Sequence, residues 1–339
     1  MNNRSRIFIR GSDRAGTLVL ASPLFRALRN AYPGAHITAC CKQATFDLLK
    51  NCPYVDEVLL YNPGHLLDTV KFGLMLRKNR YTCAFLLSGS FVSALLCLIA
   101  RIPERTGYAE DSRALLLTRP LKQDERGHVK NSLLRIVESA GIPAGSTKPE
   151  LWLTESDKEE AEKLFEENNM TKAAPVIGIS LEVKGEPSRR WDDRNFRTLI
   201  QKLLSHPNSL TVALFGSPDS GTNGAAVIAS LEKHAGLKDL TGKTSLPVFA
   251  ACLKKCHAYI SCDSGGAHIA AAAGTRTFVL FGPMDPSRWG PLGDNVTFLR
   301  GTAVCSPCSY RMMRKCRNNT CMRTITPDDV FDAVRRSLP

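Results

Sequence analysis

The sequence has no hydrophobic run long enough to cross a membrane. Its longest apolar stretch covers residues 91–100 and ends at Arg101, which is about half of the roughly 20 residues that a bilayer span requires. The N-terminal residues also lack the apolar core of a secretory signal peptide, so we expect a cytosolic protein. In that setting the 12 cysteines are interpreted as reduced thiols and not as a disulfide framework.

Acidic residues are scarce relative to basic ones. The chain carries 32 Asp and Glu against 45 Lys and Arg, which gives a formal net charge of +13. This excess points to an anionic partner, and nucleic acid, a phosphorylated small molecule and an anionic membrane surface all qualify. The basic residues are dispersed and no nucleic-acid-binding motif is present, which disfavours a nucleic-acid binder.

The glycine motif of dinucleotide-binding enzymes is missing as well. Residues 10–17, between the first expected strand and helix, contain Gly11 and Gly16 but do not form G-x-G-x-x-G. The acidic residue expected about 20 positions further on is also absent. A dehydrogenase is therefore disfavoured.

What the chain does contain is an alternation of short apolar runs and helical patterns, typical of doubly wound α/β folds. Its 339 residues favour two domains. We predict two Rossmann-like domains facing each other across a cleft, residues 1–172 and 173–339, which meet near residues 170–176. Their strands are predicted at residues 7–9, 37–40, 55–61, 84–87, 176–180, 211–215, 258–262 and 277–281.

Three residues predict the start of a last helix at 326–338. Thr326 is a suitable N-cap, Pro327 stands at the first helical position, and Asp329 completes a capping box.

The strongest candidate site follows the expected strand 258–262. Asp263, Ser264, Gly265 and Gly266 lead into an alanine-rich helix that contains His268. Glycines let a ligand approach the backbone, and the free N–H groups at a helix N-terminus attract phosphate. The alternative is a tight turn in which Asp263 caps the helix.

Two further loops follow strands of the same half. After Ser180, the segment that contains Arg189, Arg190 and Trp191 can clamp a diphosphate through charge-assisted hydrogen bonds; alternatively it is a solvated loop with Trp191 in the core. After strand 211–215, Gly216 begins a third polar loop that continues to Asp219. Three loops at equivalent strand ends predict one nucleotide pocket.

Four cysteines lie close together near the C-terminus, at positions 305, 308, 316 and 321. Such a set can hold zinc, but its spacing fits no common zinc motif and the residues between are strongly basic. We favour a basic surface loop with reduced or opportunistically paired thiols, and we expect no metal.

Seven segments, taken together and in this order, resemble the ADP-heptose:lipopolysaccharide heptosyltransferases of glycosyltransferase family 9, heptosyltransferase II in particular. The Asp-Ser-Gly-x-x-His block at 263–268 and the downstream Phe-Gly-Pro are the most specific parts. The segments are residues 13–33, 101–121, 189–196, 240–246, 262–275, 281–293 and the cysteine-bearing tail that precedes 325–330.

The resemblance implies a metal-independent, inverting GT-B glycosyltransferase with no cofactor, for which ADP-heptose is the donor substrate. The C-terminal half would bind the donor, and the N-terminal half would receive a lipid-linked lipopolysaccharide core at the cytoplasmic face of the inner membrane. The last helix would pack back on the first domain. Asp263 and His268 match the family's sugar-nucleotide motif and would hold the sugar hydroxyls and the phosphate end, while Arg189 and Arg190 would offset the charge of the leaving diphosphate.

The chain departs from the family pattern at two positions. The family usually has Gly-Asp where this chain has Gly16 and Thr17, and that Asp is its proposed general base. Threonine does not accept a proton near neutral pH, and such assistance is typically worth about 10²–10⁴-fold. Asp13 is the nearest carboxylate; it can replace the base, cap the following helix or pair with Arg14. Arg189 stands where the family has Lys, which keeps the charge and changes the geometry.

We therefore predict a heptosyltransferase with Asp13, Thr17 and Arg189 as candidate catalytic residues. An enzyme that uses another nucleotide sugar or acceptor is the first alternative. The second is a sugar-nucleotide-binding protein that has lost catalysis through Thr17.

Overall fold

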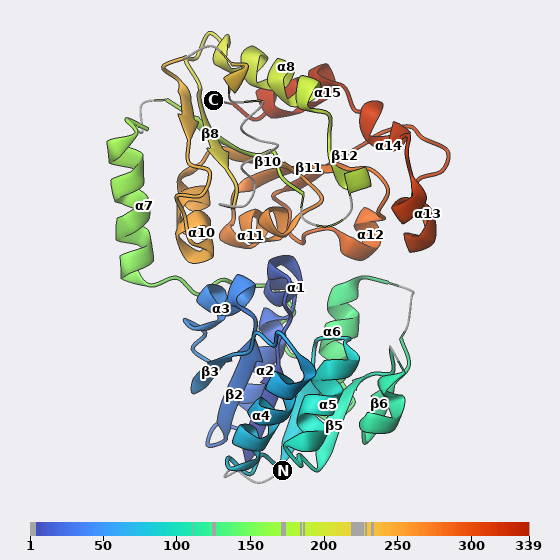
Figure 1. Cartoon of the computed structure of the whole chain (residues 1–339). Coiled ribbons are helices and arrows are strands. Elements are labelled where there is room, and N and C mark those ends of the chain that lie inside the picture. The colour runs from blue at the N-terminus through green and yellow to red at the C-terminus, as the bar shows by residue number, and fades with distance from the viewer. Residues whose placement is uncertain are drawn as a thin grey trace. The chain divides into compact units, whose positions relative to one another are not determined.

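The computed structural model describes residues 5–110, 112–123, 127–170, 174–183, 185, 187–217, 227, 229–231 and 234–338. The chain divides into two units, Met1–Trp152 and Leu153–Pro339, each built on a six-stranded parallel sheet with helices packed around it (Figure 1). The predicted α/β class is confirmed. Within the described residues, no helix is both long and apolar enough to span a bilayer.

The first unit has the strand order β3-β2-β1-β4-β5-β6. Its strands are β1 (Arg6–Arg10), β2 (His36–Cys41), β3 (Glu57–Leu60), β4 (Cys83–Leu86), β5 (Glu104–Tyr108) and β6 (Arg119–Leu121). Its helices are α1 (Ala15–Leu20), α2 (Ser22–Ala31), α3 (Gln43–Leu49), α4 (Leu66–Arg77), α5 (Phe91–Ile99), the 3₁₀ turn η1 (Arg113–Leu116) and α6 (Val129–Glu138). The helices α4 and α5 pack side by side, as do α2 and α6.

The second unit has the strand order β12-β11-β10-β7-β8-β9. Its strands are β7 (Val176–Ser180), β8 (Thr211–Phe215), β9 (Leu237–Asp239), β10 (Ala258–Cys262), β11 (Arg276–Phe281) and β12 (Val296–Arg300). Its helices are α7 (Glu155–Glu167), η2 (Pro187–Arg189), α8 (Asp193–Leu204), α10 (Leu246–Lys255), α11 (Gly265–Ala273), α12 (Pro286–Trp289), α13 (Tyr310–Lys315), α14 (Thr320–Arg323) and α15 (Pro327–Arg335).

The two sheets share one topology. Each starts at a central strand, adds two strands on one side, then returns to the centre and adds three on the other, which is the order of the Rossmann fold. The central strands β1, β7 and β10 are buried along almost their whole length, and their inner residues are mostly apolar, because helices cover both faces of a parallel sheet. The predicted strands 176–180, 211–215 and 258–262 are confirmed to the residue.

The division between the units differs from the predicted boundary at 172/173. Helix α7 packs against α10 of the second unit, and its buried residues Ala161 and Phe165 face that contact. The predicted bounds would include α7 in the first domain, but its narrow apolar stripe packs on the second unit. Residues 171–173 of the predicted junction lie outside the described residues.

The last helix begins where the sequence predicts it. Its start is confirmed, with Thr326 as N-cap, Pro327 in the first turn and a capping box through Asp329. Helix α15 packs against α8 and β11, and Val330 and Val334 are fully buried in the second unit's core. The apolar face of α15 is thus used inside its own unit; the expectation that this helix also packs on the first domain stays a prediction.

Candidate active site

In the second unit, the strand order reverses between β7 and β10, where ligands bind in open α/β sheets, beyond the carboxyl ends of the strands. Ser180 ends β7 and is paired in register with Ser261 of β10. Asp263 follows β10 directly. The predicted residues of two loops therefore meet at one sheet edge.

Arg189 and Asp263 form an ion pair at this edge. The Arg189 guanidinium donates to Asp263 Oδ2 at 3.3 Å and lies 3.5 Å from the Asp263 backbone oxygen. Asp263 is 6% exposed. Burial raises the pKa of Asp263, and the neighbouring Arg189 opposes part of that increase. The pair thus fixes a guanidinium at the switch point, where it can meet an anion.

Helix α11 begins beside this pair. Ser264 is its N-cap residue and makes no side-chain capping bond, so the alternative in which Asp263 caps the helix is wrong. The first turn, with Gly265 and Gly266, approaches β10 closely: a Cβ at Gly266 would lie 2.5 Å from Tyr259 Oη. His268 is buried in the same helix. N–H groups of a first turn without a side-chain cap can bind phosphate.

Tyr259 connects the helix to β7 and was missed by sequence reasoning. Its buried hydroxyl donates to Ser180 Oγ at 2.7 Å, and burial strongly raises its pKa. Ser180 is therefore oriented by a neutral phenol of the adjacent strand. The only sequence signal is a tyrosine inside an otherwise apolar strand.

Arg190 does not share the position of Arg189. It pairs with Asp193 in the first turn of α8, and its carbonyl oxygen accepts from Asn319 Nδ2 at 2.8 Å. Trp191 is fully buried and donates through Nε1 to the Ile325 carbonyl at 2.9 Å. The core position of Trp191 is confirmed, and only Arg189 of the two arginines contacts Asp263.

A carboxylate that was not predicted, Glu182, joins the loop after β8 to the loop after β7. Ser217 donates to Glu182 through its backbone N–H and its hydroxyl, each at 3.0 Å. The Gly216 carbonyl accepts from the Gly242 N–H at 2.9 Å. The loop thus reaches the segment after β7, as predicted; its continuation through Asp219 lies outside the described residues.

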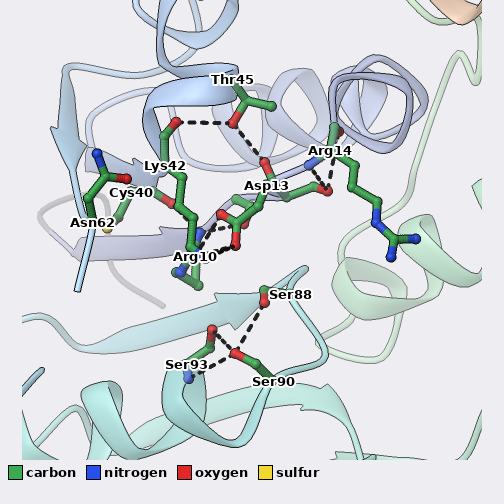
Figure 2. A network of polar contacts seen from close by, with 12 residues as sticks. Arg10, Asp13, Arg14, Cys40, Lys42, Thr45, Asn62, Ser88, Ser90 and Ser93 are labelled. Atoms are coloured by element: carbon green, nitrogen blue, oxygen red, sulfur yellow. Dashed lines mark hydrogen bonds and ion pairs between the residues drawn. The ribbon is translucent and has the colours of Figure 1, made fainter. Parts of the chain in front are cut away.

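The first unit reverses its strand order between β1 and β4, and a second charged cluster lies there (Figure 2). Asp13, in the loop after β1, accepts from Arg10 Nη2 with both carboxylate oxygens, at 2.8 and 3.0 Å. Lys42, at the end of β2, lies 3.7 Å from Asp13 Oδ2. The Asp13 side chain remains 28% exposed, so a substrate can reach it.

Buried hydrogen bonds from Arg10 and Thr45 hold the loop that carries Asp13 in place. Arg10 is 2% exposed and donates through Nη1 to the carbonyls of Gly11 and Cys40 at 2.8 and 3.2 Å. The buried Thr45 hydroxyl donates to the Ser12 carbonyl at 2.9 Å. These bonds hold the carboxylate in one orientation.

Two alternatives for Asp13 are wrong. It does not cap α1, whose N-cap residue is Arg14, and its partners are Arg10 and Lys42 in place of Arg14. Thr17 lies half-buried in the first turn of α1. Sequence reasoning missed Lys42, because its approach to Asp13 depends on the pairing of β1 with β2; the signal for Arg10 was a charge at the end of an apolar strand.

The C-terminal cysteines differ in exposure. Cys305 and Cys316 are exposed, Cys308 is half-buried and Cys321 is buried. In the part of the chain that the structure describes, no three His, Cys, Asp or Glu side chains are placed to hold a metal ion together.

Comparison with known proteins gives a consistent result. The model of glycosyltransferase family 9 (heptosyltransferase) matches residues 69–318. Lipopolysaccharide heptosyltransferase 2 of Escherichia coli is 29% identical over 310 residues, 87% of this chain and 88% of that protein. The solved structure of E. coli ADP-heptose lps heptosyltransferase II has a TM-score of 0.81 at 24% identity, covering 98% of both chains. A family 9 glycosyltransferase from Veillonella parvula has a TM-score of 0.86 at 19% identity, covering 99% of this chain and 98% of its own; both share the fold.

Proposed function

The chain belongs to glycosyltransferase family 9, the heptosyltransferase family, and from this premise we propose that it transfers heptose from ADP-heptose to the inner core of lipopolysaccharide. The names of its relatives support this choice of sugar and acceptor. We further propose that the second unit binds the donor and the first unit the lipid-linked acceptor, at the cytoplasmic face of the inner membrane.

The main evidence for the donor site is the Arg189–Asp263 ion pair beside the N-terminus of α11. As the glycosidic bond to the diphosphate breaks, negative charge develops on the leaving phosphate oxygens. A fixed guanidinium and a helix N-terminus stabilise that charge without reorganising. Asp263 holds Arg189, and with His268 it contacts the sugar and phosphate end of the donor. Arg190, which is paired with Asp193, has a smaller role.

The charges of this site also support a metal-independent reaction without a cofactor. The diphosphate needs positive charge that a divalent cation supplies in many glycosyltransferases. Here Arg189 and the first-turn N–H groups of α11 supply it. Ser180, held by Tyr259, and the backbone at Gly216 complete the wall of the site.

The acceptor hydroxyl oxygen attacks the anomeric carbon from the face opposite the diphosphate, so one displacement inverts the configuration. The new C–O bond forms as the bond to the phosphate oxygen breaks, and the hydroxyl proton must leave. We assign this proton to Asp13, which is ordered by Arg10 and partly exposed. Thr17 orients the acceptor through its hydroxyl.

Thr17 is also the observation that favours a second candidate, a donor-binding protein without transferase activity. A transferase that uses another nucleotide sugar predicts the same charged groups. Both alternatives are separated from the main proposal by a product assay.

The experiment is mass-spectrometric analysis of purified protein with ADP-heptose and heptosyl-Kdo2-lipid A, alongside calorimetric titration of ADP-heptose. Arg189→Met should weaken donor binding by about tenfold or more, the value of one charge-assisted hydrogen bond. Arg194→Met, which alters an exposed arginine of α8, is the matched control. Donor binding without product in the parent supports the binding protein; equal donor affinity in the parent and Arg189→Met contradicts the assigned site.

A further inference from the structure

Exposed apolar side chains gather on one side of the first unit. Of the eleven large hydrophobic residues that the structure describes as exposed, seven lie on α4, α5 and η1. Six of them form what we call the α4–α5 patch: Leu67 (70% exposed), Leu74 (50%), Met75 (44%), Phe91 (42%), Leu98 (41%) and Leu115 (95%). Soluble proteins rarely leave so many apolar groups together without a use for them.

The patch is continuous because its elements are in contact. Gly73 of α4 lies against α5 so closely that a Cβ there would be 2.7 Å from Ile99 Cγ2. The turn η1 packs on α5 and is anchored by the buried Arg113, which donates through Nε to the Tyr108 carbonyl at 2.7 Å. Leu115 is therefore held outward by a fixed turn.

The outward face of α4 combines apolar and cationic residues. Leu67, Lys71, Leu74, Met75 and Lys78 occur at i, i+4, i+7, i+8 and i+11, which places them on one side of the helix. The opposite side is buried through Thr69, Gly73 and Leu76.

The charges on α4 and α5, and directly after each of them, are mostly positive. Residues 66–80 and 91–101 carry five cations, at positions 71, 77, 78, 80 and 101, and a single carboxylate, Asp68. Asp68 accepts from the N–H groups of Gly64 and His65 at the start of α4, so its charge is held at the first turn of the helix. A protein partner would require a complementary acidic surface with apolar groups, whereas an anionic bilayer offers both features at once.

We propose that the α4–α5 patch docks the first unit on an anionic lipid bilayer, with the leucines in the interface and the lysines at the phosphate groups. The inference rests on the proposed function in one respect: a lipid-linked acceptor lies at such a surface. The first unit is also the one to which we assign that acceptor.

The test is sedimentation of the full chain with phosphatidylcholine vesicles that contain or lack phosphatidylglycerol. The parent should bind the anionic vesicles, less at high salt. Leu67→Gln with Leu74→Gln should weaken binding by at least tenfold. Lys71→Gln with Lys78→Gln should weaken it by about fivefold for each lysine and reduce the salt dependence. The matched control is Val304→Gln, which alters a fully exposed valine of the second unit and should leave binding unchanged.

Failure of the parent to bind anionic vesicles, or equal binding by the parent and the leucine variant, would overturn the proposal. So would sedimentation velocity showing a dimer of the parent that the leucine variant disperses while its vesicle binding is unchanged, because the patch would then join two copies. Transfer to a deacylated, water-soluble acceptor is measured in parallel. It should be equal in the parent and both patch variants; its absence from the parent contradicts the proposed function while the vesicle data still decide the docking surface.

Discussion

Replacing Asp13 by asparagine tests the assignment of the general base. The substitution keeps the size of the side chain, and its amide oxygen can still accept from Arg10 Nη2, now 2.8 Å from Oδ1. It removes the group that accepts the proton, so kcat should fall by about 10²–10⁴-fold. Arg10 retains its bonds to the Gly11 and Cys40 carbonyls, and Asp13 is partly exposed. We therefore expect a loss of only about 1–2 kcal/mol in the free energy of unfolding.

The assay is product formation at saturating ADP-heptose and acceptor, with urea unfolding of each variant to show that it is folded at the assay temperature. Donor affinity should be unchanged, because Arg189 and Asp263 belong to the second unit. Asp47→Asn is the matched control, since Asp47 lies on α3 of the same unit and pairs only with Lys50 at the surface among the described residues.

A kcat for Asp13→Asn within about threefold of the parent would refute the assignment. The companion variant Thr17→Asp restores the carboxylate that the family usually has. A large gain in kcat with Thr17→Asp, together with an unaffected Asp13→Asn, would show that the family base was lost without replacement.

Three further outcomes are expected. Burial raises the pKa of Asp263 above its ordinary value of 3.8, so its contribution to stability is lost as the pH rises from about 4 through the folded-state pKa. The unfolding free energy of the parent minus that of Asp263→Asn, measured in urea, should therefore fall as the pH rises above about 4, and a flat difference would contradict the buried carboxylate. Trp191→Phe should cost about 2 kcal/mol in urea unfolding, because it opens a cavity and removes the donor to the Ile325 carbonyl; a cost below about 0.5 kcal/mol would be inconsistent with this packing. Dialysis against EDTA should leave transfer unchanged, whereas a loss that added divalent cation restores would show that the reaction needs a metal.

The parts of the fold that could be predicted are those in which local pattern and burial agree. The strands β7, β8 and β10 are apolar throughout and fully covered, so their limits can be read from the sequence. The strands β5, β6, β9 and β12 were missed. Their residues are polar or partly exposed, because strands toward the edge of a sheet bury less and their pattern is weaker.

Long-range packing accounts for the other differences. The capping box of α15 is a local signal and gave the helix start to the residue. The element against which Val330 and Val334 pack depends on where α8 lies, and no short sequence window contains that information. The unit to which α7 belongs could not be predicted for the same reason. This helix is mostly charged, and its narrow apolar stripe packs against α10, which is distant in the sequence.

The candidate sites show the same limit. Asp263 and Arg189 were each recognisable from strand-end loops, but their ion pair joins positions 74 residues apart. Lys42 and Thr45 reach the loop of Asp13 only because β1 pairs with β2 in parallel. Sequence patterns thus identified the loops that carry the candidate residues, and the sheet order determines which of their side chains meet.

The shared strand order places a similar pair of charged groups at the same point of each unit. Each switch point carries an arginine–aspartate pair: Arg10 with Asp13, and Arg189 with Asp263. In the first unit the arginine is the buried partner, 2% exposed, and the carboxylate is 28% exposed. In the second the carboxylate is buried, with its pKa raised, and the arginine is the more exposed partner. In the mechanism that we propose, one pair therefore presents a base and the other a cation. The proposed transfer requires one of each, because a proton must be accepted from the acceptor hydroxyl and the leaving diphosphate must be stabilised.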